Sequence, residues 1–115
     1  MSEKRAELAD RIRALLADEP TREDKRMFGS LAFLVRGRLL VAAWGEGDLL
    51  VRVDPERSAE LLLRDGVRPA EMGPQRKRMG LGWLDVAAEV VAEDEELLFW
   101  IDLAREFDGS GERLA

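Results

Sequence analysis

Positively charged residues in the middle of the chain form the clearest grouping of side chains that could carry chemistry. Arginine is a forked hydrogen-bond donor suited to phosphate or carboxylate groups. Three cations occur consecutively, and we expect two more arginines to lie near them in a small sheet. This candidate anion or nucleic-acid patch consists of Arg26, Arg68, Arg76, Lys77 and Arg78. The alternative interpretation is a solvated loop, which is what charge runs usually form.

Catalysis and metal binding find little support in the residue types. The chain has no cysteine and no histidine, which removes thiolate chemistry, the commonest general base and the commonest metal ligand. Ser30 therefore has no histidine to activate it, and Glu71, Asp85 and Glu89 are not paired in the sequence around an apolar pocket. We predict a non-enzymatic protein with no catalytic residue, metal or cofactor, and no small-molecule substrate is identifiable.

Two further patterns have structural explanations. The four acidic residues at positions 93–96 precede an apolar run, where a helix N-terminus would stabilise them through its dipole. The glycine pairs at positions 45 and 47 and at positions 80 and 82 are followed by strand-like segments rather than helices. They therefore predict turns rather than phosphate-binding loops.

Length and composition predict one globular domain. The chain has 115 residues, of which 46% are hydrophobic and 37% charged, and its formal net charge is −6. That charge disfavours nucleic acid as a direct partner of the whole surface.

The N-terminus lacks the apolar core of a signal peptide and no run is long enough to span a membrane, so we expect a cytoplasmic protein without membrane contact. Residues 1–115 should form a single domain with an ordered core at about 3–107 and a flexible, glycine-containing tail at 108–115.

A β-meander at residues 27–53 is the segment that must position these side chains. Apolar runs at residues 31–35, 39–44 and 49–53 are separated by short turn signals. Arg36-Gly37 suits a tight hairpin, since glycine supplies the positive φ that such a turn requires. A short connector at residues 21–25 is expected to lead into the meander.

Helices and two further strands are predicted around the meander. Asp54 followed by Pro55 is typical of a helix start, and Gly66 is typical of the left-handed residue beyond a helix end. Together the patterns predict an α+β fold with an antiparallel sheet of about five strands in the order α-β-β-β-α-β-β-α. The flanking segments are a helix at 3–17, a helix after residue 54, an edge strand at 67–72, a basic loop at 73–78, a strand at 79–86 and a helix at 94–107.

The meander strands do not alternate between apolar and polar residues, so both faces of the sheet should be apolar. Either the chain covers both faces itself, or one face is an interaction surface, for instance in a homodimer. The candidate interaction face consists of Leu34, Leu40, Ala42 and Trp44.

Several short motifs, taken together, resemble the N-terminal domain of the TfoX/Sxy competence regulators. They occur in family order: Met-Phe-Gly-Ser-Leu-Ala-Phe at 27–33, Leu-Val-Arg-Val at 50–53, Gly-Val-Arg-Pro at 66–69, then Met79, Trp83-Leu84 and Trp100. The resemblance covers residues from about 25 to 107. It implies an α+β fold similar to that of secretion chaperones, and a regulatory role exercised with a transcription factor.

The resemblance has two departures. The family's namesakes also carry a C-terminal helical domain of helix-hairpin-helix type, which this 115-residue chain lacks, so we expect a stand-alone N-terminal domain. The loop at 73–78 is longer and more basic than the usual family turn. The resemblance supplies no catalytic residue.

We therefore expect a regulatory protein-interaction module whose partner is another protein or a second copy of itself. The second hypothesis is a nucleic-acid-binding regulator that uses the arginine patch, and the third is an unrecognised enzyme.

Overall fold

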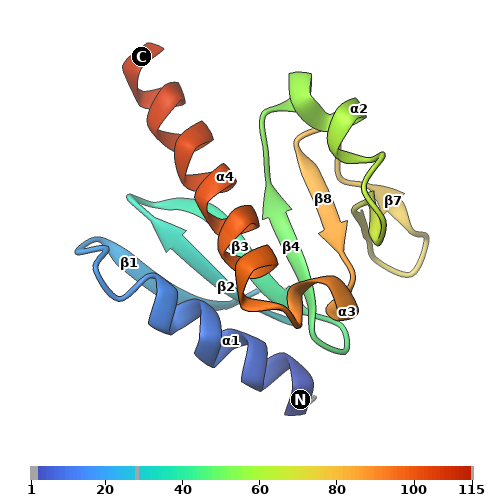
Figure 1. Cartoon of the computed structure of the whole chain (residues 1–115), viewed down its shortest axis with the longest axis horizontal. Helices are drawn as coiled ribbons and strands as arrows, with labels where there is room; N and C mark the ends of the chain where they lie inside the picture. The colour runs from blue at the N-terminus through green and yellow to red at the C-terminus, as the bar shows by residue number, and fades with distance from the viewer. Residues whose placement is uncertain (1–2, 28, 115) are drawn as a thin grey trace.

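A six-stranded antiparallel sheet forms the centre of the molecule (Figure 1). The computed structural model describes residues 3–27 and 29–114, and of residues 27 and 108–114 it describes the backbone alone. Phe28 and Ala115, which belong to the first family motif and to the expected tail, lie outside the described residues. The strands run in the order β1-β2-β3-β4-β8-β5, and their bounds are β1 Arg22–Met27, β2 Ser30–Val35, β3 Arg38–Trp44, β4 Asp48–Arg52, β5 Val67–Pro69 and β8 Trp83–Val86.

A two-stranded ribbon completes the β-structure. It pairs β6 (Glu71–Met72) with β7 (Lys77–Arg78) and occupies the segment predicted as a basic loop. The α+β class and the antiparallel sheet are thus confirmed, although the sheet has one strand more than expected and the ribbon is additional.

The helices pack mainly against one face of the sheet. They are α1 (Glu3–Leu15), a 3₁₀ turn η1 (Pro55–Arg57), α2 (Ser58–Leu61), α3 (Ala88–Val91) and α4 (Asp94–Leu114). Figure 1 shows α1, α3 and α4 on the viewer's side of the sheet. None of the described helices is both long and apolar enough to cross a bilayer.

Local sequence signals account for several of these elements. Arg36 and Gly37 have φ angles of 54° and 78°, as the predicted tight β2–β3 hairpin requires. Asp54 caps η1, since its Oδ1 accepts a hydrogen bond from the amide of Glu56 at 3.0 Å. Gly66 has a φ of 78° and precedes β5. The hairpin, the Asp54 cap and the left-handed φ of Gly66 are confirmed. However, α2 ends at Leu61, so Gly66 lies further along the loop than the predicted position directly past the helix.

Strand β1 was not predicted, because its sequence has no apolar alternation. Five of its six residues are charged, and the prediction for this segment was a connector. It nonetheless pairs with β2 over its whole length, from Arg22 opposite Val35 to Met27 opposite Ser30. A charged strand at the edge of a sheet discourages pairing with other chains.

Other boundaries also differ from the predictions. The edge strand expected at residues 67–72 is divided between β5 and the ribbon, and β8 begins only at Trp83. The short helix α3 has no counterpart in the predicted order. The last helix continues past Phe107, where the prediction ends it, to Leu114.

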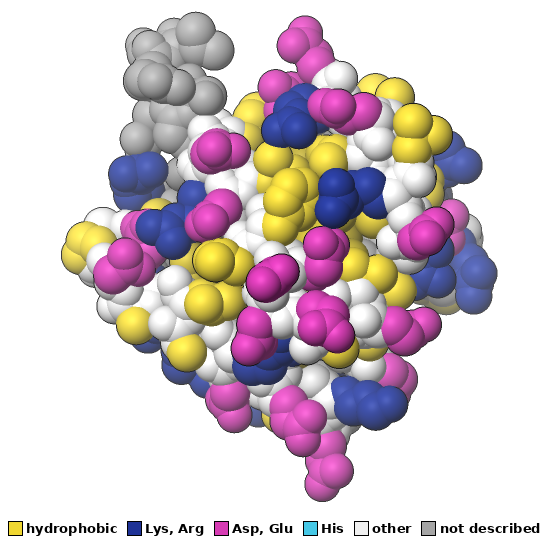
Figure 2. Space-filling view, in the orientation of Figure 1, with side chains coloured by type: hydrophobic (Ala, Val, Ile, Leu, Met, Phe, Trp, Pro, Cys, Tyr) yellow, Lys and Arg dark blue, Asp and Glu magenta, His cyan; other side chains and the backbone are white. Residues whose placement is uncertain are grey.

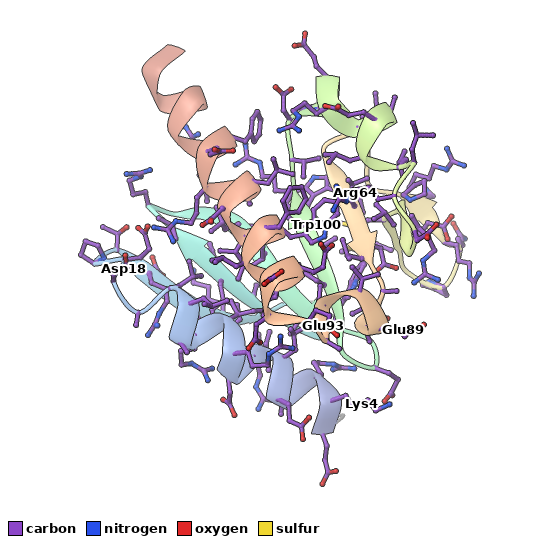
Figure 3. All side chains as sticks on the ribbon, viewed as in Figure 1. Lys4, Asp18, Arg64, Glu89, Glu93 and Trp100 are labelled. Carbon is purple, nitrogen blue, oxygen red and sulfur yellow. The ribbon has the colours of Figure 1, made fainter. Side chains whose placement is uncertain are left out.

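The main core lies between the helices and the sheet. Its largest fully buried side chains include Ile12 from α1, Phe33 from β2, and Leu97 and Trp100 from α4. The rings of Phe99 and Trp100 meet edge to face at 5.2 Å. Arg64 extends over them, with its guanidinium carbon 4.4 Å from the Phe99 ring centroid and 5.8 Å from that of Trp100 (Figure 3). This core explains why α4 is apolar on several sides.

Replacement of Gly66 by alanine should destabilise the fold more than replacement of Gly73. Both glycines have a left-handed φ, at 78° and 81°. A Cβ at Gly66 would approach Val90 Cγ2 to 2.5 Å, whereas a Cβ at Gly73 meets nothing within 4 Å. We expect Gly73→Ala to lower the free energy of unfolding by about 1 kcal/mol, and Gly66→Ala by about 3 kcal/mol because a clash is added to the strain. Urea unfolding followed by circular dichroism measures both, and equal losses would contradict the packing described.

Candidate protein-interaction surface

The strand register identifies the residues that share the face of the sheet opposite the helices, here called the helix-free face. Residues directly paired across neighbouring strands point to the same side. One such row crosses all six strands, from β1 at one edge to β5 at the other. Its members in spatial order are Lys25, Ala32, Ala42, Leu50, Asp85 and Arg68.

An apolar cluster separate from the main core covers the centre of the helix-free face. Its buried members are mostly small, and the larger side chains around them are only half-buried. The buried residues are Ala32, Leu34, Ala42, Leu50 and Ala70, and the half-buried ones are Leu39, Trp44, Met79 and Trp83. Leu39, Met79 and Trp83 were absent from the predicted face. Alternation in Trp83-Leu84-Asp85-Val86 could have identified Trp83. Leu84 and Val86 pack in the main core, so Trp83 and Asp85 point to the opposite face.

The prediction for Leu40 was wrong, whereas Leu34, Ala42 and Trp44 do share this face. Phe33 pairs with Val41 and Leu34 pairs with Leu39, so the register shifts between them and Leu40 lies opposite no residue of β2. As a result, Leu40 and Val41 both pack in the main core beneath the helices. A β-bulge of this kind changes the alternation of a strand, and nothing in the local sequence marks it.

A hydrogen-bonded carboxylate lies at one end of the apolar cluster. Asp85 accepts a hydrogen bond from Trp44 Nε1 at 3.2 Å and an ion-paired one from Arg68 Nη2 at 2.8 Å. Its side chain is 17% exposed. Desolvation raises the pKa of Asp85 above its ordinary value, and the Asp48 carboxylate also raises it, whereas Trp44 and Arg68 act in the opposite direction. The network holds the Trp44 indole against the sheet.

The five residues of the predicted arginine patch do not come together. Arg26 belongs to β1, which lies at the opposite edge of the sheet from β5. It pairs with Leu31, which packs against the main core, so Arg26 also lies on the helix side of the sheet. Arg68 on β5 is paired with Asp85. Arg76, Lys77 and Arg78 lie in the β6–β7 ribbon, where all three are exposed.

Grooves lined by described residues open on other parts of the surface, and two of them include charged side chains in their lining. One, of about 450 Å³, lies between α1, the β3–β4 turn and α3, and its charged lining includes Lys4, Glu7, Arg11, Glu46 and Glu89. The other, of about 420 Å³, is lined by Arg64, Asp65, Glu89, Val90, Glu93 and Glu96 (Figure 3). Asp85 lines neither groove. Among the described residues, no group of three or more acidic side chains is placed to hold a metal ion.

Comparison with known proteins identifies the family of the chain. Residues 14–107 match the model of the family described as the TfoX N-terminal domain, and the chain belongs to this family. This confirms the resemblance carried by the ordered motifs. No curated protein matches the chain. No solved structure matches it either.

The raised pKa of Asp85 predicts a pH dependence of stability. Between the ordinary value of 3.8 and the raised value, the folded protein binds more protons than the unfolded chain. The free energy of unfolding contributed by this group therefore falls as the pH rises through that window. Asp85→Asn removes the effect, so its stability relative to the wild type should improve as the pH rises through the same window.

Urea unfolding at a series of pH values measures this difference. Asp65→Asn, which removes an exposed carboxylate, is the control. A stability difference for Asp85→Asn that is constant with pH, or that becomes less favourable as the pH rises, would contradict the assigned environment.

Proposed function

We propose that this member of the TfoX N-terminal domain family is a regulatory protein-interaction module that catalyses no reaction. Its helix-free face contacts another protein or a second copy of the chain in the cytoplasm. The observation that carries the proposal is the second apolar cluster, whose large side chains Leu39, Trp44, Met79 and Trp83 are only half-buried. Membership of a regulatory family supports the same function.

The arrangement of the face favours a protein partner. Tryptophan and methionine are enriched at protein interfaces relative to the rest of the protein surface. Trp44 is held by Asp85 and packs beside the small residues Ala32 and Ala42, so the centre of the face is fixed before a partner arrives. Preorganisation of this kind lowers the entropic cost of binding.

The residue types also favour binding over catalysis. A chain without histidine or cysteine depends on carboxylates, serine or lysine for proton transfer and nucleophilic attack. Asp85, the described carboxylate whose pKa is raised, is engaged by Trp44 and Arg68. Its role in the proposed module is to position the indole.

Site-specific cross-linking tests the proposed interaction face. A photo-reactive benzoylphenylalanine placed at position 39 lies on the helix-free face, and one placed at position 98 lies on α4 on the helix side. Leu39 is half-buried and Leu98 is 41% exposed, so both positions are accessible to solvent. We expect irradiation of cells that express the variants at native level to give discrete adducts from position 39 and none from position 98.

Mass spectrometry of the adducts identifies the partner as a second copy or a different protein. Circular dichroism of both variants checks that they are folded. Adducts from position 98 alone, or none from position 39 in a folded variant, would overturn the assignment of this face.

A further inference from the structure

Three consecutive cations on the β6–β7 ribbon lack a carboxylate partner within the described part of the chain. Arg76, Lys77 and Arg78 are exposed, and no hydrogen bond or ion pair involves their side chains there. Several arginines elsewhere are paired, for example Arg11 with Asp94 at 2.7 Å and Arg105 with Glu19 at 3.0 Å. Acidic residues outnumber basic ones by 24 to 18, yet three adjacent cations stand together here without an ion pair, and an external anion would satisfy them.

The ribbon holds these cations close together. Its turn closes with a hydrogen bond from the Arg76 amide to the Gly73 carbonyl at 3.0 Å. Lys77 and Arg78 then pair with Met72 and Glu71 across the ribbon. The positive charge is therefore presented on a short, closed hairpin rather than on an extended loop.

The base of the hairpin is hydrogen-bonded to residues of the apolar cluster on the helix-free face. The Ala70 amide donates to the Trp83 carbonyl at 3.2 Å, and the Met79 amide donates to the Ala70 carbonyl at 2.9 Å. Ala70, Met79 and Trp83 all belong to that cluster. An apolar surface and a group of unpaired cations are thus contiguous.

We propose that the helix-free face binds an acidic amphipathic segment of a partner protein. Apolar side chains of the segment pack on Leu39, Trp44, Met79 and Trp83, and its aspartate or glutamate side chains pair with the hairpin cations. This inference rests on the proposed function and adds the chemistry of the partner. Complementary charge at the rim accelerates association and selects against basic partners.

A protein segment fits this surface better than a nucleic acid. Asp85 lies in the cross-strand row of the same face and already neutralises Arg68. A nucleic acid carries a negative charge at every nucleotide and would meet this carboxylate, whereas an amphipathic protein segment can place an apolar side chain there. The indole N–H of Trp44 donates to Asp85, so it is not available to a base edge. The helix side offers no substitute, since Figure 2 shows acidic side chains spread widely over it.

Selection from a random peptide library displayed on phage tests the proposal without assuming a sequence. The wild-type protein should enrich peptides that combine apolar residues with net negative charge. The variant R76A/K77A/R78A should bind these peptides about tenfold more weakly at physiological salt. The loss should shrink in high salt, since exposed charges are then screened.

The matched control is K4A/R26A/R57A, which removes the same charge at exposed positions outside the ribbon and should retain wild-type affinity. Enrichment of neutral or basic peptides, equal binding by the hairpin variant, or no enrichment would each overturn the inference. Binding of a single-stranded or duplex oligonucleotide that the hairpin variant loses would also overturn it. Light scattering that shows a wild-type dimer and a monomeric hairpin variant would also overturn it, because the cations would then contact a second copy of the chain.

Leu39→Glu separates failure of the inference from failure of the proposed function. Peptides that lose binding to Leu39→Glu but are not acidic would leave the interaction face standing and remove only the acidic partner. Acidic peptides that bind Leu39→Glu as they bind the wild type would show that the helix-free face is not the docking surface, and the proposed function would fail with the inference.

Discussion

Strands β2, β3 and β4 carry apolar side chains on both faces, while the long helices α1 and α4 pack on one. This imbalance determines most of the structure. The helix side buries its large residues completely, with Phe33, Ile12 and Trp100 at 0% exposure. The opposite side keeps its central residues small and leaves larger side chains half-buried around them. Small residues reduce the apolar area exposed to water where no helix is available to cover it.

The edge of the helix-free face depends on a polar network rather than on apolar packing. Burial of Asp85 is unfavourable for its charged form, and the hydrogen bonds from Arg68 and Trp44 offset part of that cost. Trp44 and Asp85 come from strands β3 and β8, which are separated by β4 in the sheet. The network therefore ties the meander to the segment that carries the β6–β7 ribbon. Tertiary contacts of this kind fix the orientation of a tryptophan that would otherwise rotate.

Charge follows the same division between two sides. The helix side is acidic, and many of its arginines are neutralised by nearby carboxylates. The ribbon instead places three cations beside the apolar cluster of the other side. A regulatory module with one apolar surface and a local reversal of charge can select its partner by sign as well as by shape. The fold thus offers a physical basis for partner specificity in the proposed module.

The sequence by itself determined the features that depend on neighbouring residues: the Arg36-Gly37 hairpin, the Asp54 cap, the α+β class and the family. Positive φ angles and side-chain caps are local, so residue type is sufficient to predict them. It also grouped Leu34, Ala42 and Trp44, which do share the helix-free face. Only the tertiary structure decided that the charged segment β1 is a strand and that a bulge places Leu40 in the main core. It also decided that Arg26 lies far from the ribbon and that Trp44 contacts Asp85, which is 41 residues away in the sequence. Strand order and register are set by contacts between distant segments, which the local pattern of residues does not encode.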